Sequence, residues 1–135
     1  MKKRLLLWSL ISISQFVIGQ KNDKIYFTKN HNYSTTYSYD VTEIIIHSDS
    51  TYTRMNWSTF GKKDWTNYKK YKPELSNGKI HFNGKNYVLN EYRNGNKTDF
   101  SWNIKLTERK LIYFYYVGQG KIEKGLKFKR VRKGN

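Results

Sequence analysis

The sequence predicts an all-β domain, built as an antiparallel meander of about eight to ten strands. Apolar side chains recur at every second position in several segments. In residues 98–106, Phe100, Trp102, Ile104 and Leu106 alternate with polar side chains, which is the period of a strand. Turn signals separate these segments at intervals of about 8–12 residues, as in all-β folds. A small closed barrel is favoured because closure removes exposed sheet edges, and an open sandwich is the alternative.

Each strand is expected from its own short pattern. In chain order, the defining positions are Ile25 and Phe27; Ile44 to Ile46; Met55 and Trp57, after Thr51 and Thr53; Ile80 and Phe82; Tyr87 and Leu89; the row from Phe100 to Leu106; Leu111 to Val117; and Leu126 and Phe128 within Gly125 to Arg132. Turns are expected at Asp49-Ser50, Asn83-Gly84, Arg93 to Asn96 and Gly118 to Gly120. Asn83-Gly84 is the strongest hairpin signal, because both residues tolerate positive φ.

Two stretches depart from simple alternation. Residues 111–117 are apolar on both faces of a strand, so they must be covered on both sides or present tyrosines to solvent. In residues 62–72, Trp65, Tyr68 and Tyr71 recur at a spacing of three residues before Pro73. This spacing predicts a short helix or an irregular loop there.

The first nineteen residues predict export. Lys2, Lys3 and Arg4 precede a short apolar stretch, and Val17 and Gly19 provide compact side chains before Gln20. This is the pattern of a cleaved signal peptide over residues 1–19. The mature chain, residues 20–135, is then a single β domain without an integral membrane segment, placed in the periplasm or secreted.

Composition excludes several kinds of chemistry. The chain has no cysteine, which excludes thiol nucleophiles and thiolate metal sites. The three histidines lie on different segments without metal-binding spacing, so neither a metal nor another cofactor is expected. The ten acidic residues are scattered, and only Glu43 and Glu91 lie within strands where they could face a cavity. No catalytic residues are assigned, and a non-enzymatic protein is favoured.

The order of segments resembles a known group of proteins. A signal peptide, then IIIHSDSTYT (residues 44–53), paired strands and a closing LIYFYYVGQGK and GLKFKRV resemble small secreted lipocalin-like β-barrel proteins of bacteria. Those proteins share a strand ending in an Asp-Ser/Gly-Thr-Tyr type of turn and a final Phe-x-Arg strand. The lipocalin Gly-x-Trp motif is absent. The resemblance implies a barrel fold and export, and loosely implies ligand binding.

The first functional hypothesis is a binding barrel. Apolar side chains that alternate along strands would line its interior, which in a barrel of about eight strands is either filled or holds one small ligand. We therefore expect an interior site for a small apolar or amphipathic molecule, formed by Met55, Trp57, Phe100, Trp102 and Ile104.

The alternative hypothesis is a cationic surface. After residue 19 the chain has 23 basic and 10 acidic residues, which favours anionic partners. Lysines interleave with aromatic rings in residues 62–72, and this combination suits anionic polymers. The partner would be lipopolysaccharide, an acidic glycan or extracellular nucleic acid, bound by Lys62, Lys63, Trp65, Tyr68, Lys69, Lys70, Tyr71 and Lys72.

Overall fold

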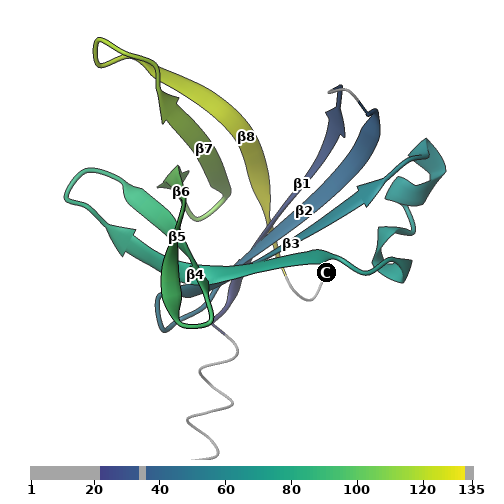
Figure 1. Cartoon of the computed structure of the whole chain (residues 1–135), viewed down its shortest axis with the longest axis horizontal. Helices are drawn as coiled ribbons and strands as arrows, with labels where there is room; N and C mark the ends of the chain where they lie inside the picture. The colour runs from purple at the N-terminus through teal and green to yellow at the C-terminus, as the bar shows by residue number, and fades with distance from the viewer. Residues whose placement is uncertain (1–21, 34–35, 133–135) are drawn as a thin grey trace, which may run out of the picture.

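The chain folds into a closed barrel of eight antiparallel strands (Figure 1). The computed structural model describes residues 22–33 and 36–132, so the predicted signal peptide and its boundary at Gln20 lie outside the described residues. The strands are β1 (Lys24–Asn32), β2 (Ser38–Ile46), β3 (Thr51–Thr59), β4 (Glu74–Phe82), β5 (Tyr87–Arg93), β6 (Asn96–Leu106), β7 (Lys110–Tyr116) and β8 (Ile122–Val131). The predicted all-β meander and its closure are confirmed, and the open sandwich is excluded. No helix within the described ranges is long and apolar enough to cross a membrane.

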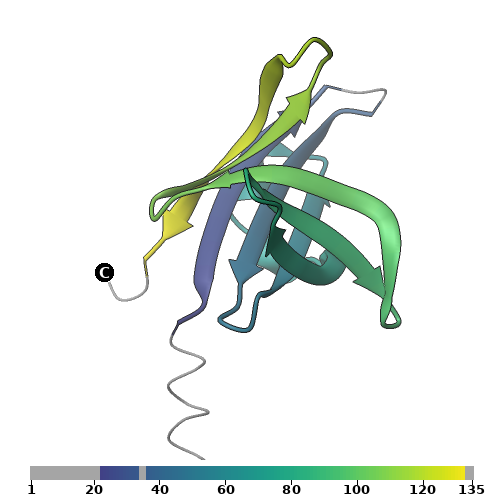
Figure 2. The ribbon, with the colours of Figure 1, turned by 90° about the vertical axis from the view of Figure 1, so that its left-hand side faces the viewer.

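Each strand pairs with the next one in the chain, and the barrel closes where β1 meets β8. This closing seam is short, because only Ile25 to Phe27 pair with Lys129 to Val131. From the seam, the β1–β2 and β7–β8 hairpins diverge toward their tips (Figure 1), and Figure 2 shows the same hairpins after a quarter turn. The pairing of β6 with β7 is also short and ends at Asn103 and Phe114. The first half of β6 therefore pairs with β5 alone.

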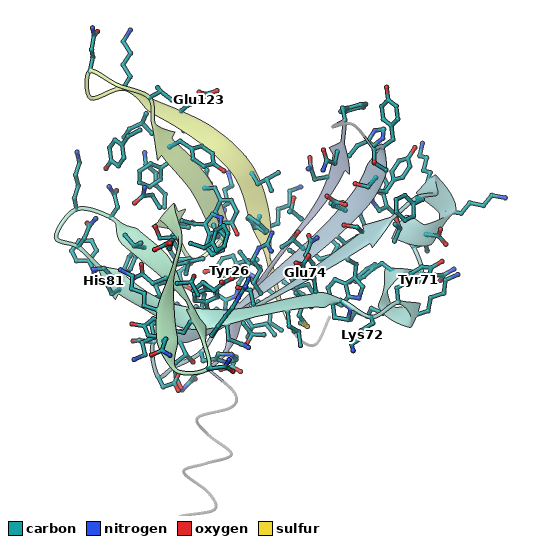
Figure 3. The ribbon with its side chains drawn as sticks, viewed as in Figure 1. Tyr26, Tyr71, Lys72, Glu74, His81 and Glu123 are labelled. Atoms are coloured by element: carbon teal, nitrogen blue, oxygen red, sulfur yellow. The ribbon has the colours of Figure 1, made fainter. Side chains whose placement is uncertain are left out.

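Apolar side chains fill the middle of the barrel. The buried ones come from seven strands and Ile80 on β4 packs against them, which places one continuous core between opposite walls. Tyr26 lies at its centre (Figure 3), and its hydroxyl donates a hydrogen bond to the carbonyl oxygen of Thr107 at 2.9 Å. The buried members are Tyr26, Ile44, Ile46, Tyr52, Leu89, Ile104, Leu111, Tyr113 and Phe128, with Ile80, Trp102, Leu106 and Leu126 packed against them.

A second layer covers the outer face of β1, β2 and β3. It is formed by residues 62–72, where η1 (Lys62–Trp65) and η2 (Tyr68–Lys70) are short 3₁₀ turns, in line with the short helix or loop predicted there. Trp57 lies beneath this segment, with its Nε1 donating to the carbonyl oxygen of Tyr71 at 3.0 Å. The Trp57 and Tyr68 rings meet edge to face at 5.0 Å. Both faces of β3 are therefore buried along part of its length.

The two-residue hairpin turn is Asn94-Gly95, whereas Asn83-Gly84 was predicted to be the strongest hairpin signal. Asn94 and Gly95 both have positive φ, 52° and 80°, and these two residues connect β5 to β6 as in a type I′ hairpin. In the Asn83 turn only Gly84 has positive φ. Its connection runs from Asn83 to Asn86, because the Asn83 side-chain oxygen accepts hydrogen bonds from the backbone N–H groups of Lys85 and Asn86. That local bonding favours a wider turn.

Candidate functional site

A buried carboxylate lies at the end of the barrel where β4, β5 and β6 leave the core. Glu91 is 5% exposed. Its Oε2 accepts a hydrogen bond from Ser76 Oγ at 2.9 Å, and its Oε1 accepts one from Thr98 Oγ1 at 3.1 Å. Arg93 Nε lies 3.0 Å from the same Oε1. These contacts satisfy the charge, because buried carboxylates need a cation or hydrogen-bond donors. We call Arg54, Ser76, Glu91, Arg93 and Thr98 the Glu91 cluster.

An irregularity in β6 turns Thr98 toward Glu91. Asn90 pairs with Ser101, whereas Tyr92 pairs with Lys97, so residues 98–100 lie opposite Glu91 alone. The Thr98 hydroxyl also accepts a hydrogen bond from the N–H of Phe100 at 3.2 Å. Bulges of this kind re-aim side chains and are frequent beside functional sites. The bulge is thus the local feature that completes the carboxylate's set of donors.

Arg54 enters the cluster from β3. It follows Tyr52 by two residues and therefore shares the inward face of the strand. Its guanidinium carbon lies 5.8 Å from the centroid of the Trp102 ring, a cation–π contact. Its Nε is enclosed and has no hydrogen-bond partner within the described part of the chain. The end of the barrel thus brings together a carboxylate with hydrogen-bond donors on both oxygens and a guanidinium whose Nε has no acceptor.

A small hollow opens beside these groups, and we call it the Glu91 hollow. Its volume is 180 Å³. Charged and aromatic side chains line it together: Arg54, Glu74, Leu75, Ser76, Glu91, Arg93, Phe100 and Trp102. A second hollow of 300 Å³ shares Leu75, Ser76, Glu91 and Arg93 with it. Glu91 and Arg93 therefore line two concavities, of which only the smaller one is lined by Phe100 and Trp102.

A third hollow, of 310 Å³, lies on the outer side of β3, β4 and β5, and its charged lining residue is the exposed Lys79. His47 in its wall is engaged by Asp23 at 3.1 Å and by Thr53 at 3.0 Å. Lys79 lies 4.7 Å from the centroid of the Tyr92 ring. The Glu91 hollow instead combines a buried carboxylate and a partly buried guanidinium with two aromatic rings, so it is the better candidate site.

Burial changes the acidity of tyrosines near the cluster. Burial raises the pKa of Tyr52 to about 12, a smaller effect of Ser76 opposes it, and the Glu91 charge adds to it. Burial also raises the pKa of Tyr113, against the opposing effect of the Arg54 guanidinium. Both hydroxyls are enclosed, with the Ser76 hydroxyl beside Tyr52 and the Arg54 guanidinium beside Tyr113. Both phenols therefore keep their protons at neutral pH and remain potential hydrogen-bond donors.

The structure separates the residues that were expected to line the interior. Ile104 is buried in the core, and Trp102 packs against it. Met55 and Trp57 instead lie on the outer face of β3, because they pair with Glu43 and Val41 on β2, whereas inward-facing Ile44 pairs with Arg54. Their placement in the interior is therefore wrong.

Phe100 was expected to be buried with Trp102, and this is wrong, since it is 58% exposed. The core row ends because β6 loses its partner β7 before residue 103. Phe100 does lie next to the Trp102 ring, with centroids 6.5 Å apart and planes 16° apart. It therefore belongs to the rim of the Glu91 hollow instead of to the core.

The residues expected to bind polyanions are not all at the surface. The five lysines are exposed, but Trp65 packs edge to face on Tyr39 with ring centroids 4.6 Å apart. The Tyr68 hydroxyl donates to Glu43 Oε1 at 3.1 Å, and burial raises its pKa to about 12, helped by the Glu43 charge. Trp65 and Tyr68 thus attach the segment to the barrel and are only partly exposed.

Tyr71 is the ring of this segment that stays partly accessible. It is 43% exposed and lies beside Lys72 at the edge of the molecule (Figure 3). Its hydroxyl donates to Asp64 Oδ1 at 3.1 Å, and Lys70 Nζ lies 5.0 Å from its ring centroid.

Glu43, bound to Tyr68, lies on the outer face of the sheet, away from inward-facing Glu91, so the two strand carboxylates do not form a pair.

Sequence reasoning did not bring Arg54, Ser76, Glu91 and Thr98 together. The usable signal was a charge on the apolar face of an alternating strand: Arg54 follows Tyr52 by two positions, and Glu91 follows Leu89 by two.

The fold and the hollow define an eight-stranded antiparallel β-barrel with a polar cluster at one end. Comparison of the chain with protein-family models, curated proteins and solved structures finds no match.

Proposed function

We propose that the chain is an exported, non-enzymatic β-barrel that binds a small amphipathic molecule in the Glu91 hollow. The observation that carries this proposal is the lining of that hollow, where the Phe100 and Trp102 rings lie beside Arg54 and Glu91. Ligand sites typically combine apolar walls with a few fixed polar groups. The likeness to small secreted lipocalin-like barrels supports the same class of function.

The size of the hollow limits the ligand. A cavity of about 150 Å³ holds a single benzene ring, and the Glu91 hollow measures 180 Å³. The filled core beneath it leaves the ligand at the rim. The contacts of Glu91 favour a binding role over a catalytic one, because Ser76, Thr98 and Arg93 already engage both of its oxygens. The expected ligand therefore has about one ring and one polar group.

Two-dimensional NMR with benzyl alcohol as the probe tests this function. We expect shifts concentrated at Trp102, Ser76 and Glu91, with saturation in the millimolar range or below, as about eight non-hydrogen atoms allow. Phe100→Ala should weaken binding several-fold. Phe82→Ala is the matched control, because Phe82 is 55% exposed and lies outside the hollow. Equal binding by both variants, or shifts that avoid Trp102, would show that the hollow is not the site.

A second candidate function is the binding of anionic polymers by the lysine-rich segment 62–72. The favouring observation is that Lys62, Lys63, Lys69 and Lys72 are exposed and make no ion pair within the described residues. Because Trp65 and Tyr68 pack against the barrel, we expect attraction mainly by charge, which weakens steeply with salt.

Elution from immobilised heparin by salt tests the second candidate. We expect replacement of the five lysines in residues 62–72 by Gln to lower the eluting salt concentration. The control replaces five lysines on the β7–β8 side by Gln, namely Lys110, Lys121, Lys124, Lys127 and Lys129. If both variants elute at the same salt concentration, net charge and not this segment governs the attraction.

A further inference from the structure

Arg54 is a cation on the inward face of β3 without an anionic partner in the described residues. Ion pairs there join Lys24 and Arg130 to Glu108, His47 to Asp23, Lys70 to Asp64 and Arg93 to Glu91, and none includes Arg54. The Trp102 ring faces its guanidinium at 5.8 Å. A cation–π contact offsets only part of the cost of enclosing a charge. The guanidinium is therefore available to bind an anion from outside the chain.

Glu91 is the buried acid of the hollow, and both of its oxygens already have partners. Oε1 binds Thr98 and Arg93, while Oε2 binds Ser76. The Arg93 charge offsets that of Glu91, so the pair leaves Arg54 as the uncompensated charge. Glu74, the other acid of the lining, is exposed, and water and salt screen its repulsion of an anion.

One nitrogen of Arg54 lacks an acceptor. Arg54 Nε is enclosed and has no hydrogen-bond partner within the described structure. Native proteins leave few buried donors unsatisfied, and the exceptions call for an explanation. A group that supplies an acceptor oxygen beside Arg54 would satisfy this Nε.

We propose that the Glu91 hollow takes a small planar carboxylate, with its carboxylate group on the Arg54 guanidinium and its apolar part against Phe100 and Trp102. This inference rests on the proposed function and specifies its ligand class. The planar fork of a guanidinium matches the two oxygens of a carboxylate. A flat apolar body suits the near-parallel Phe100 and Trp102 rings, and one ring fits the 180 Å³ volume.

Calorimetric titration with three probes tests the ligand class. Benzoate, benzyl alcohol and benzylamine share one aromatic ring and differ in charge at neutral pH. We expect benzoate to bind at least tenfold more tightly than benzyl alcohol, and benzylamine to bind most weakly. Arg54→Met keeps the apolar stem and should abolish the preference for benzoate, while Arg54→Lys keeps the charge without the fork and should retain part of it. Arg109→Met removes one exposed charge at the β6–β7 turn and should keep the full preference.

The outcomes separate this inference from the function on which it rests. If benzyl alcohol binds at Trp102 and benzoate binds no more tightly, the carboxylate assignment is wrong while the proposed function stands. If Arg54→Met keeps the preference for benzoate, Arg54 is not the anion site. If none of the three probes perturbs Trp102, the proposed function is wrong as well.

Discussion

Replacing Gly78 with alanine would place a methyl group 1.9 Å from the carbonyl oxygen of Asn90 and 2.8 Å from Cε1 of Tyr52. Gly78 lies on the inward face of β4, between Tyr52 on β3 and Glu91 on β5. Cβ atoms essentially never approach other atoms within 3.0 Å, so β4 and β5 would have to separate by about 1 Å. The obstacle is backbone, which cannot rotate away as a side chain can.

The expected loss of stability follows from that geometry. Overpacking of a filled interior costs about 1–3 kcal/mol, and each weakened backbone hydrogen bond between β4 and β5 adds about 1 kcal/mol. Alanine offsets about 0.4–1 kcal/mol of this loss, because it gives the unfolded chain less conformational freedom than glycine does. We therefore expect Gly78→Ala to lower the free energy of unfolding by about 3 kcal/mol. Because Gly78 pairs with Glu91, the Glu91 hollow should be distorted too.

Gly125→Ala on β8 is the matched control, and urea unfolding followed by tryptophan fluorescence is the assay. A methyl group at Gly125 would lie 2.6 Å from Cε2 of Tyr115. That ring is half exposed and can turn into solvent, so the expected change is within about 1 kcal/mol. Equal destabilisation by both substitutions would refute the reasoning, because it would show that the loss of a strand glycine, and not the approach to Asn90, sets the cost.

Two further predictions concern the core and its titration. Leu111→Ala should lower the free energy of unfolding by about 2–5 kcal/mol, since Leu111 is fully buried. Phe100→Ala should lower it by less than about 1 kcal/mol. Similar urea midpoints for the two variants would contradict the placement of Leu111 in the core and Phe100 at the rim. Burial raises the pKa of Tyr52 from 10.0 to about 12, so the unfolded chain releases this proton first as pH rises. The stability linked to Tyr52 is complete below pH 10 and is lost between about pH 10 and 12. Tyr52→Phe should therefore reduce the fall in stability between about pH 10 and pH 12, and an unchanged fall would show that Tyr52 does not titrate in this range.

The sequence pattern located the strands well, because alternation reports the strand period directly. Which face was inward was harder to predict, as β3 illustrates. Met55 and Trp57 carry the apolar residues of that strand, but they lie under residues 62–72 on the outside of the barrel. Alternation shows that one face is apolar, and does not show whether a barrel interior or an added layer covers it.

The candidate site depended on features beyond a single strand. Glu91 meets Ser76 and Thr98 through the register of three strands and a bulge, and no local pattern fixes either. Phe100 continues an apolar row, yet it is exposed because it lies in the part of β6 that does not pair with β7. Where strands end relative to their neighbours determined which predicted residues reached the core and which formed the rim.

The short seam between β1 and β8 has a consequence for how the chain reaches its fold. Ile25 pairs with Val131, so the first and last strands of the barrel must meet across nearly the whole domain. Contacts so distant in sequence form late, because closing a long loop costs entropy before any contact is gained. The barrel therefore cannot close until β8 has been synthesised, and until then β1 and β7 each present an unpaired edge. A chain truncated before Ile122 would keep both edges, and its expected fate is association with other copies.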